Sequence, residues 1–125
     1  MNRNMSIKTP ECWSSDSQAD GLRIELSRDL ILLLPFNQFL LAELKVENKE
    51  QHLRLVFAMH EVLIMGRNLK RLQIAMQKKE LAFIAKVSSN YELPPADGAP
   101  LIQDIVVSEA KSRHDGIPAA RGGGV

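Results

Sequence analysis

Residues 51–87 read QHLRLVFAMHEVLIMGRNLKRLQIAMQKKELAFIAKV, and this stretch decides the fold. Leu53, Leu55 and Phe57 alternate with other residues at the period of a strand that buries one face. A turn at Met59 and His60 then leads to a returning strand over residues 61–65. Gly66 follows, and glycine can adopt the positive φ that a sharp strand exit requires.

The second half of the same stretch predicts one helix over residues 68–81. Asn68 is a favourable N-cap residue. One helical face is apolar, at Leu69, Leu72, Ala75 and Met76, with Leu81 ending the segment. A further strand is predicted where Phe83, Ile84 and Val87 follow. Because each lies on the apolar phase of its element, we expect four residues to be nearly fully buried and in contact: Leu55, Phe57, Ile64 and Leu72.

On the N-terminal side, Leu22, Ile24 and Leu26 alternate with charged residues and predict another half-buried strand. Residues 30–34 are then continuously apolar up to Pro35. A run of this kind is typical of a central strand covered on both faces, or of a strand that lies in a subunit interface.

Residues 39–47, FLLAELKVE, fit two structures. As a helix, Phe36, Phe39, Leu40 and Leu44 would share one face; as a strand, alternate residues would do so. The strand matches more positions, so we predict a strand, with residues 48–51 as the hairpin loop into the next one. Residues 91–100 are predicted to be a loop with three prolines, and residues 101–107 a last strand.

These elements predict an α+β fold: a single small domain over residues 21–110, with a mostly antiparallel sheet of six or seven strands and one helix near residues 68–81. The apolar groups exceed what one helix covers, so the sheet either curls into a barrel or places its second face against another chain. Residues 1–20 are predicted to be a disordered or loosely docked leader, with Trp13 as a candidate anchor, and residues 111–125 a disordered tail.

Composition narrows the class of protein. The formal net charge of +1 supplies no global field that would draw the chain to nucleic acid or membrane. Cys12 is the only cysteine, so no internal disulfide can form, which favours a reducing compartment. The N-terminal residues lack the apolar region of a signal peptide, and the longest apolar run, residues 30–34, is too short to span a bilayer. We expect a soluble, cytoplasmic protein without membrane association.

Charge is concentrated around the predicted helix. Between Gly66 and Glu80 a single acid accompanies five basic residues, Arg67, Lys70, Arg71, Lys78 and Lys79. Helical spacing would align Arg67, Arg71 and Lys78, and such a ridge could bind phosphate or an acidic protein surface. The competing interpretation is an ordinary solvated helix face. Nucleic-acid binding is weakly supported, because no aromatic residue is interleaved with these charges before Phe83.

Catalytic and metal sites have little support. His60 adjoins Glu61 at a predicted hairpin tip, but neither His52 nor His114 stands at metal-ligand spacing from it. No serine lies in a G-x-S-x-G elbow and no glycines form a phosphate loop. We expect no catalytic activity, no metal and no cofactor.

The sequence therefore predicts a small non-enzymatic interaction or structural module that forms homo-oligomers through an apolar sheet face. The candidate interface residues are Leu30, Leu32, Leu33 and Leu34. The alternative is a protein that binds nucleic acid or another anionic partner through Arg67, Lys70, Arg71, Lys78 and Lys79. A minimal enzyme with a site centred on His60 is the third and weakest hypothesis.

Overall fold

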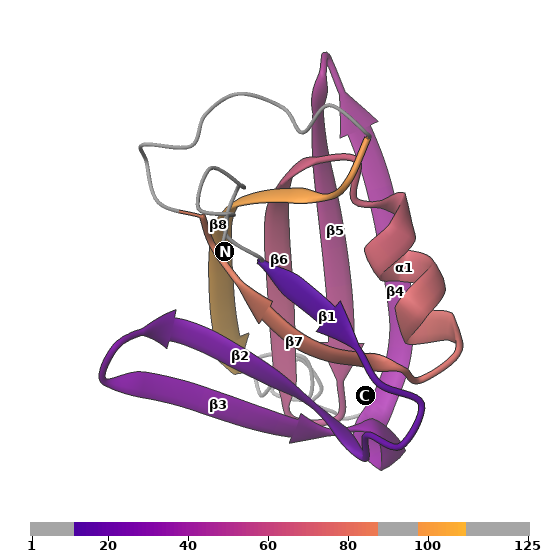
Figure 1. Ribbon diagram of the computed structural model, residues 1–125, viewed down its shortest axis with the longest axis vertical. Helices are drawn as coiled ribbons and strands as arrows, with labels where there is room; N and C mark the ends of the chain where they lie inside the picture. The colour runs from indigo at the N-terminus through magenta and orange to yellow at the C-terminus, as the bar shows by residue number, and fades with distance from the viewer. Residues whose placement is uncertain (1–11, 88–97, 110–125) are drawn as a thin grey trace, which may run out of the picture.

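The computed structural model describes residues 12–87 and 98–109 (Figure 1). In chain order the elements are β1 (Trp13–Ser15), β2 (Gly21–Ser27), β3 (Leu30–Pro35), the 3-10 turn η1 (Phe36–Gln38), β4 (Phe39–Glu47), β5 (Glu50–Phe57), β6 (His60–Arg67), α1 (Lys70–Gln77), β7 (Leu81–Ala85) and β8 (Leu101–Glu109).

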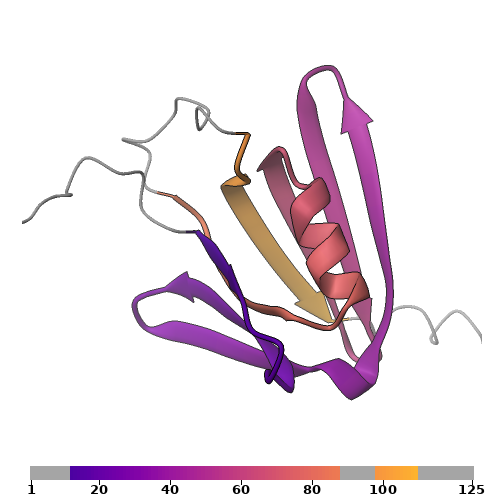
Figure 2. The same cartoon turned by 45° about the vertical axis from the view of Figure 1, so that its right-hand side comes forward.

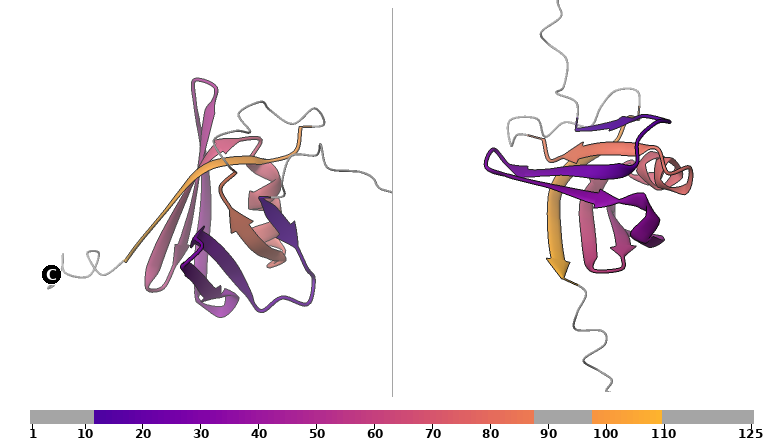
Figure 3. Two further views of the ribbon diagram at one scale, coloured as in Figure 1. Left: turned by 60° about the vertical axis from the view of Figure 1, so that its left-hand side comes forward. Right: turned by 90° about the horizontal axis from the view of Figure 1, so that it is seen from below.

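The described strands form two four-stranded sheets. Sheet A has the order β1-β7-β2-β3 and sheet B the order β4-β5-β6-β8. The pairing of β2 with β7 is parallel, and the others are antiparallel. The sheets face each other, and α1 lies along one side of the space between them (Figures 2 and 3). The predicted α+β class, with a mostly antiparallel sheet and one helix, is confirmed. The described strands do not close into a barrel, because they form two separate sheets that face each other.

The core fills the space between the sheets. Leu55, Ile64 and Leu72 are completely buried, Phe57 is 1% exposed, and all four belong to one cluster. Removing a side chain of this size from water contributes about 1.5–3 kcal/mol. The predicted strand and helix phases over residues 53–76 are thereby confirmed.

Residues 39–47 form a strand, as predicted, although their amino acids are good helix formers. Strand β4 pairs with β5 from Phe39 to Glu47, and this pairing outweighs helical propensity. The connecting turn is shorter than the predicted loop, with Asn48 and Lys49 alone between the strands. Asn48 takes the left-handed conformation (φ 57°) that this tight turn needs and that asparagine tolerates. The next turn lies at Ala58 and Met59, and His60 already begins β6.

Strand β3 contradicts the prediction of a central strand covered on both faces. It is an edge strand of sheet A, with β2 as its one neighbour. Leu34 points into the core and Leu32 packs partly against it, whereas Ile31 and Leu33 are exposed. Continuous apolar sequence therefore reflects one buried face and one apolar face in water. Pro35 ends the strand, as predicted.

Helix α1 is shorter than the predicted span of residues 68–81. Asn68 does not cap it: this residue has a positive φ of 56°, and the helix N-cap is Leu69. The Leu69 N–H donates instead to the side-chain oxygen of Gln51 in β5, at 2.7 Å. At the other end, Lys79 is left-handed (φ 57°), and the Glu80 N–H donates to the Ala75 carbonyl at 2.8 Å. This pattern is a Schellman termination, after which Leu81 begins β7.

Gly66 has a different role from the predicted strand exit. It lies inside β6 and does not have a positive φ. A Cβ atom at this position would overlap the carbonyl oxygen of Leu101 in the neighbouring strand β8. Glycine is needed here because two backbones approach closely where the β6–β8 register shifts.

Residues 12–20, assigned from the sequence to a disordered or loosely docked leader, are ordered, and Trp13, the candidate anchor, packs partly against the core. Trp13–Ser15 form β1, which pairs with β7, and Cys12 is a core residue that is 4% exposed. The sequence signal was missed because a three-residue strand is too short to show a period. Residues 1–11, residues 91–97 of the predicted loop over 91–100, and the predicted tail at 111–125 lie outside the described residues.

Candidate functional site

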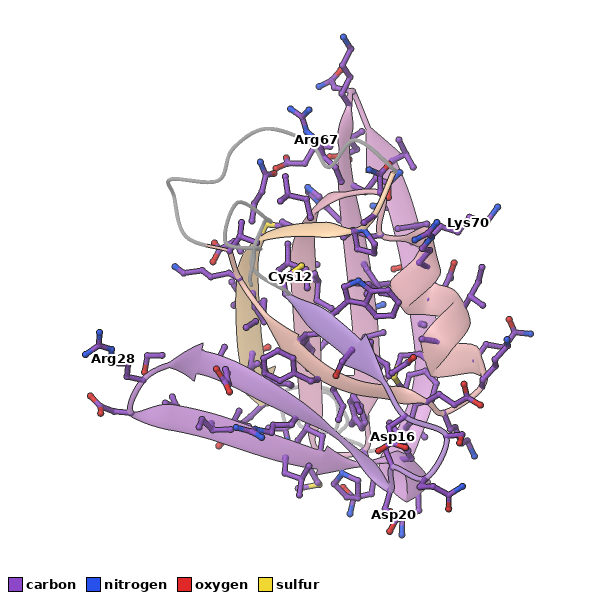
Figure 4. The ribbon with its side chains drawn as sticks, viewed as in Figure 1. Cys12, Asp16, Asp20, Arg28, Arg67 and Lys70 are labelled. Atoms are coloured by element: carbon purple, nitrogen blue, oxygen red, sulfur yellow. The ribbon has the colours of Figure 1, made fainter. Side chains whose placement is uncertain are left out.

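The predicted basic ridge is divided by the structure. Arg67 ends β6 opposite Leu101, outside the helix, so it does not continue the stripe of Arg71. It lines a hollow of about 380 Å³ together with Glu47, Asn48, Lys49, Glu50 and Gln103, where both signs of charge are present. Figure 4 shows Arg67 near the end of sheet B and Lys70 on the first turn of α1. The left-handed Asn68 causes the separation, because it turns the chain before the helix begins.

Four cations remain together on and just after α1, namely Lys70, Arg71, Lys78 and Lys79, and all four are exposed. The ion pairs formed within residues 12–87 and 98–109 use Arg23, His52 and Arg54 as their cations. In that part of the chain the α1 cations therefore have no acidic partner. These four cations, without Arg67, are what the structure keeps of the predicted basic ridge.

An aromatic residue that sequence reasoning left in the leader lies beside two of these cations. Trp13 and Ser15 of β1 and Arg71, Ile74, Ala75, Lys78 and Glu80 line a shallow hollow of about 190 Å³, which we call the Trp13 hollow. The Asp16 N–H donates to the Glu80 carbonyl at 2.8 Å, which ties the residue after β1 to the residue before β7. This contact joins residues 64 positions apart, so no local sequence pattern predicts it.

Apolar side chains are exposed mainly on β3 and β4. Of the nine large apolar residues that are exposed in the described part of the chain, six lie on these strands: Leu30, Ile31, Leu33, Leu40, Leu41 and Val46. Leu33 is the most exposed, at 69%. Of the four residues of the predicted interface set, Leu30 and Leu33 are exposed, Leu32 packs partly against the core and Leu34 is buried.

The outer face of sheet A around Leu33 is semi-polar. Leu33 pairs with Arg23 of β2, which in turn pairs with Phe83 of β7. The guanidinium carbon of Arg23 lies 5.8 Å from the centroid of the Phe83 ring, within range of a cation–π contact. Arg23 also bonds to Glu25 at 3.0 Å. The apolar edge strand β3 thus lies next to Arg23 and Glu25, whose opposite charges neutralise each other.

Sheet B carries an ion cluster that sequence reasoning missed. Arg54 lies 2.9 Å from a carboxylate oxygen of Glu61 and 3.2 Å from one of Glu43. The hydrogen bond to Glu61, followed by its charge, raises the pKa of Arg54 above the ordinary arginine value. The hairpin turn could have revealed half of this cluster, since Glu43 and Arg54 are equally distant from Asn48 and Lys49 and therefore pair. The cluster joins three strands, and its single cation leaves one carboxylate charge in excess.

The residues of the predicted histidine site do not converge. His60 and Glu61 are consecutive in β6, so their side chains point to opposite faces, and Glu61 bonds to Arg54. His52 lies 3.4 Å from Glu50 instead. Within the described residues no three side chains of the metal-ligating types cluster. His114 lies outside these residues.

In the described ranges, no helix has the length and apolar character needed to cross a membrane. Comparison of the chain with protein-family models, with curated proteins and with solved structures finds no match.

Proposed function

We propose that this protein is a non-enzymatic interaction module that assembles with a second copy of itself through the edge strand β3. The observation that carries the proposal is the exposure of an uncharged edge: Leu33 is 69%, Leu30 49% and Ile31 48% exposed. Contiguous apolar surface of this kind marks protein–protein contacts more often than plain solvent surface.

The edge position of β3 strengthens the argument. One side of β3 pairs with β2, and no other described strand pairs with its second side. Natural proteins protect such edges with lysine, inward charges or bulges, because unpaired backbone groups invite another strand. Residues 30–34, LILLL, carry no charge, and the two protective features of this edge lie at its ends: Pro35 and the register shift of the β2–β3 pairing beside Leu30 and Ile31. We therefore expect another strand to pair with this edge and cover it.

A second copy is the occupant that fits best. Antiparallel self-pairing centred on Leu32 would set Leu33 of one copy opposite Ile31 of the other, on the outer face. In this register Arg28 and Asp29 lie beyond the apolar run and oppose uncharged residues, so no like charges meet. The two copies of sheet A would form one continuous sheet about a two-fold axis.

Sedimentation velocity at micromolar concentration tests the proposal. The protein should sediment as a dimer, and Leu33→Glu should shift it to a folded monomer, because the carboxylate replaces the apolar cross-strand contact of Leu33 with Ile31 of the second copy. Val46→Glu is the matched control, since Val46 is similarly exposed (62%) but lies on β4. It should leave the dimer intact. A wild-type monomer, or equal loss of assembly in both variants, would refute β3 pairing.

We infer a second function, binding of an anionic partner, from the α1 cations. It is supported by the absence of acidic partners for Lys70, Arg71, Lys78 and Lys79 within residues 12–87 and 98–109. Retention on a heparin column at low salt should fall steeply as salt rises, because each contact releases counterions. Arg71→Glu together with Lys78→Glu should abolish retention. Arg67→Glu should not, because Arg67 lies in the separate hollow of mixed charge.

We also propose a cytoplasmic location. The support is that a chain with one cysteine, which lies in the core, gains nothing from an oxidising compartment. Fractionation of cells that express a tagged chain would test it, and recovery outside the cytoplasm would refute it.

A further inference from the structure

We propose that the Trp13 hollow binds an acidic segment of a partner protein that inserts one apolar side chain between β1 and α1. This inference rests on the second proposed function and names its partner. It is carried by the placement of one indole ring, one exposed isoleucine and two cations around a single depression.

The floor and wall of the hollow are apolar. Trp13 packs partly against the core, Ala75 is buried, and Ile74 is 42% exposed on the outward side of α1. The volume of about 190 Å³ falls below the range of about 300–1,000 Å³ typical of small-molecule sites. A depression of this size suits a single side chain carried on a peptide.

The charges set the character of the segment. Arg71 and Lys78 are seven residues apart, with Ile74 between them, so the three lie on one helical stripe. Their separation along the axis is about 10 Å at the rise of an α-helix. The side chains of an extended peptide alternate between its two faces, so only residues two or four positions apart face the same surface. Two acidic residues four positions apart, with an apolar residue midway between them, would therefore present all three side chains to the cations and the hollow. The long Arg71 and Lys78 side chains can reach across the span of about 13 Å.

A protein segment fits these observations better than nucleic acid does. Single-stranded nucleic acid requires aromatic faces that are open for base stacking, whereas Trp13 is partly buried. Glu80 also lines the hollow and would repel a continuous phosphate backbone, but it tolerates a peptide whose acids are separated. The charge pattern and the ring placement both favour an acidic peptide.

Titration with a short peptide in which two Asp residues lie four positions apart, with Leu midway between them, tests the proposal. Trp13 is the only tryptophan, so its fluorescence reports directly on the hollow. The emission should shift on addition of the peptide, and binding should weaken with salt. Arg71→Glu together with Lys78→Glu should reduce affinity by about tenfold or more, because two attractions become repulsions. Ile74→Ser should also reduce it.

The controls separate the hollow from general attraction. Lys45→Glu and Lys49→Glu change exposed cations of β4 and its turn, and they should leave the affinity nearly unchanged. A peptide with Ser in place of Leu should bind more weakly. Equal binding of the Ser peptide, or equal loss in both pairs of reversals, would overturn the inference. If an oligothymidylate binds and the Leu peptide does not, the acidic-peptide inference is wrong and the anionic-partner function stands. If heparin, the peptide and the oligothymidylate all fail to bind, the inference and the anionic-partner function are both refuted.

Discussion

The Phe39 and Phe57 rings lie 5.5 Å apart between centroids, at an interplanar angle of 58°, across the β4–β5 pairing. This tilted arrangement is one of the favourable geometries of aromatic pairs. Phe39 joins the edge strand of sheet B to Phe57 in the core, and the contact exists only because residues 39–47 are a strand. The aromatic pair is therefore a consequence of the β4–β5 pairing, which makes residues 39–47 a strand and not a helix.

Phe57→Ala should lower the free energy of unfolding by about 3–5 kcal/mol, because it leaves a cavity in a close-packed core. Urea denaturation followed by Trp13 fluorescence, at one protein concentration, measures the change. Phe39→Ala is the control: the Phe39 side chain is only partly buried, so its loss should cost less. A larger effect at Phe39 would mean that the assignment of the core is wrong.

Gly66→Ala should destabilise the protein by about 1–3 kcal/mol, even though alanine is the smallest possible addition. The new Cβ atom would meet the Leu101 carbonyl oxygen, which belongs to the backbone of a paired strand and cannot rotate away. Thermal unfolding provides the measurement. A variant with wild-type stability would show that β6 and β8 are farther apart than the structure places them.

Lys79→Gly should raise the free energy of unfolding by about 0.5–1 kcal/mol, because glycine adopts the left-handed conformation without the steric cost paid by lysine. Lys79 has a φ of 57° at the C-terminus of α1. Lys79→Ala separates this effect from the loss of charge and should give no gain. If both variants stabilise the protein equally, repulsion among the α1 cations is the cause instead.

The thiol of Cys12 should react with a disulfide reagent much more slowly in the native protein than in denaturant. Its side chain is 4% exposed, and its sulfur donates to the Pro100 carbonyl at 3.5 Å. Reaction therefore requires local opening of the sheet A edge. The absorbance of the released thiolate follows the rate, and equal rates in both conditions would show that the start of the domain is not docked.

The sequence by itself predicted the strands from Gly21 onward, one helix, and the buried faces of residues 53–76. The period of apolar side chains is a local property of the sequence. It correctly predicted that Leu55, Phe57, Ile64 and Leu72 are buried. The same period predicted every described strand from Gly21 onward. It also predicted the β4 strand against helical propensity, because alternation extended over more positions than any helical face.

Only the tertiary structure decided which neighbours these elements have. Apolar character does not distinguish a central strand from an uncovered edge, so the position of β3 and the inward turn of Leu32 and Leu34 were not predictable. One left-handed residue, Asn68, removed Arg67 from the ridge, and long-range pairing brought Trp13 to Arg71 and Lys78. Backbone pairing between distant segments depends on the packing of the whole chain, and a sequence pattern carries no record of it.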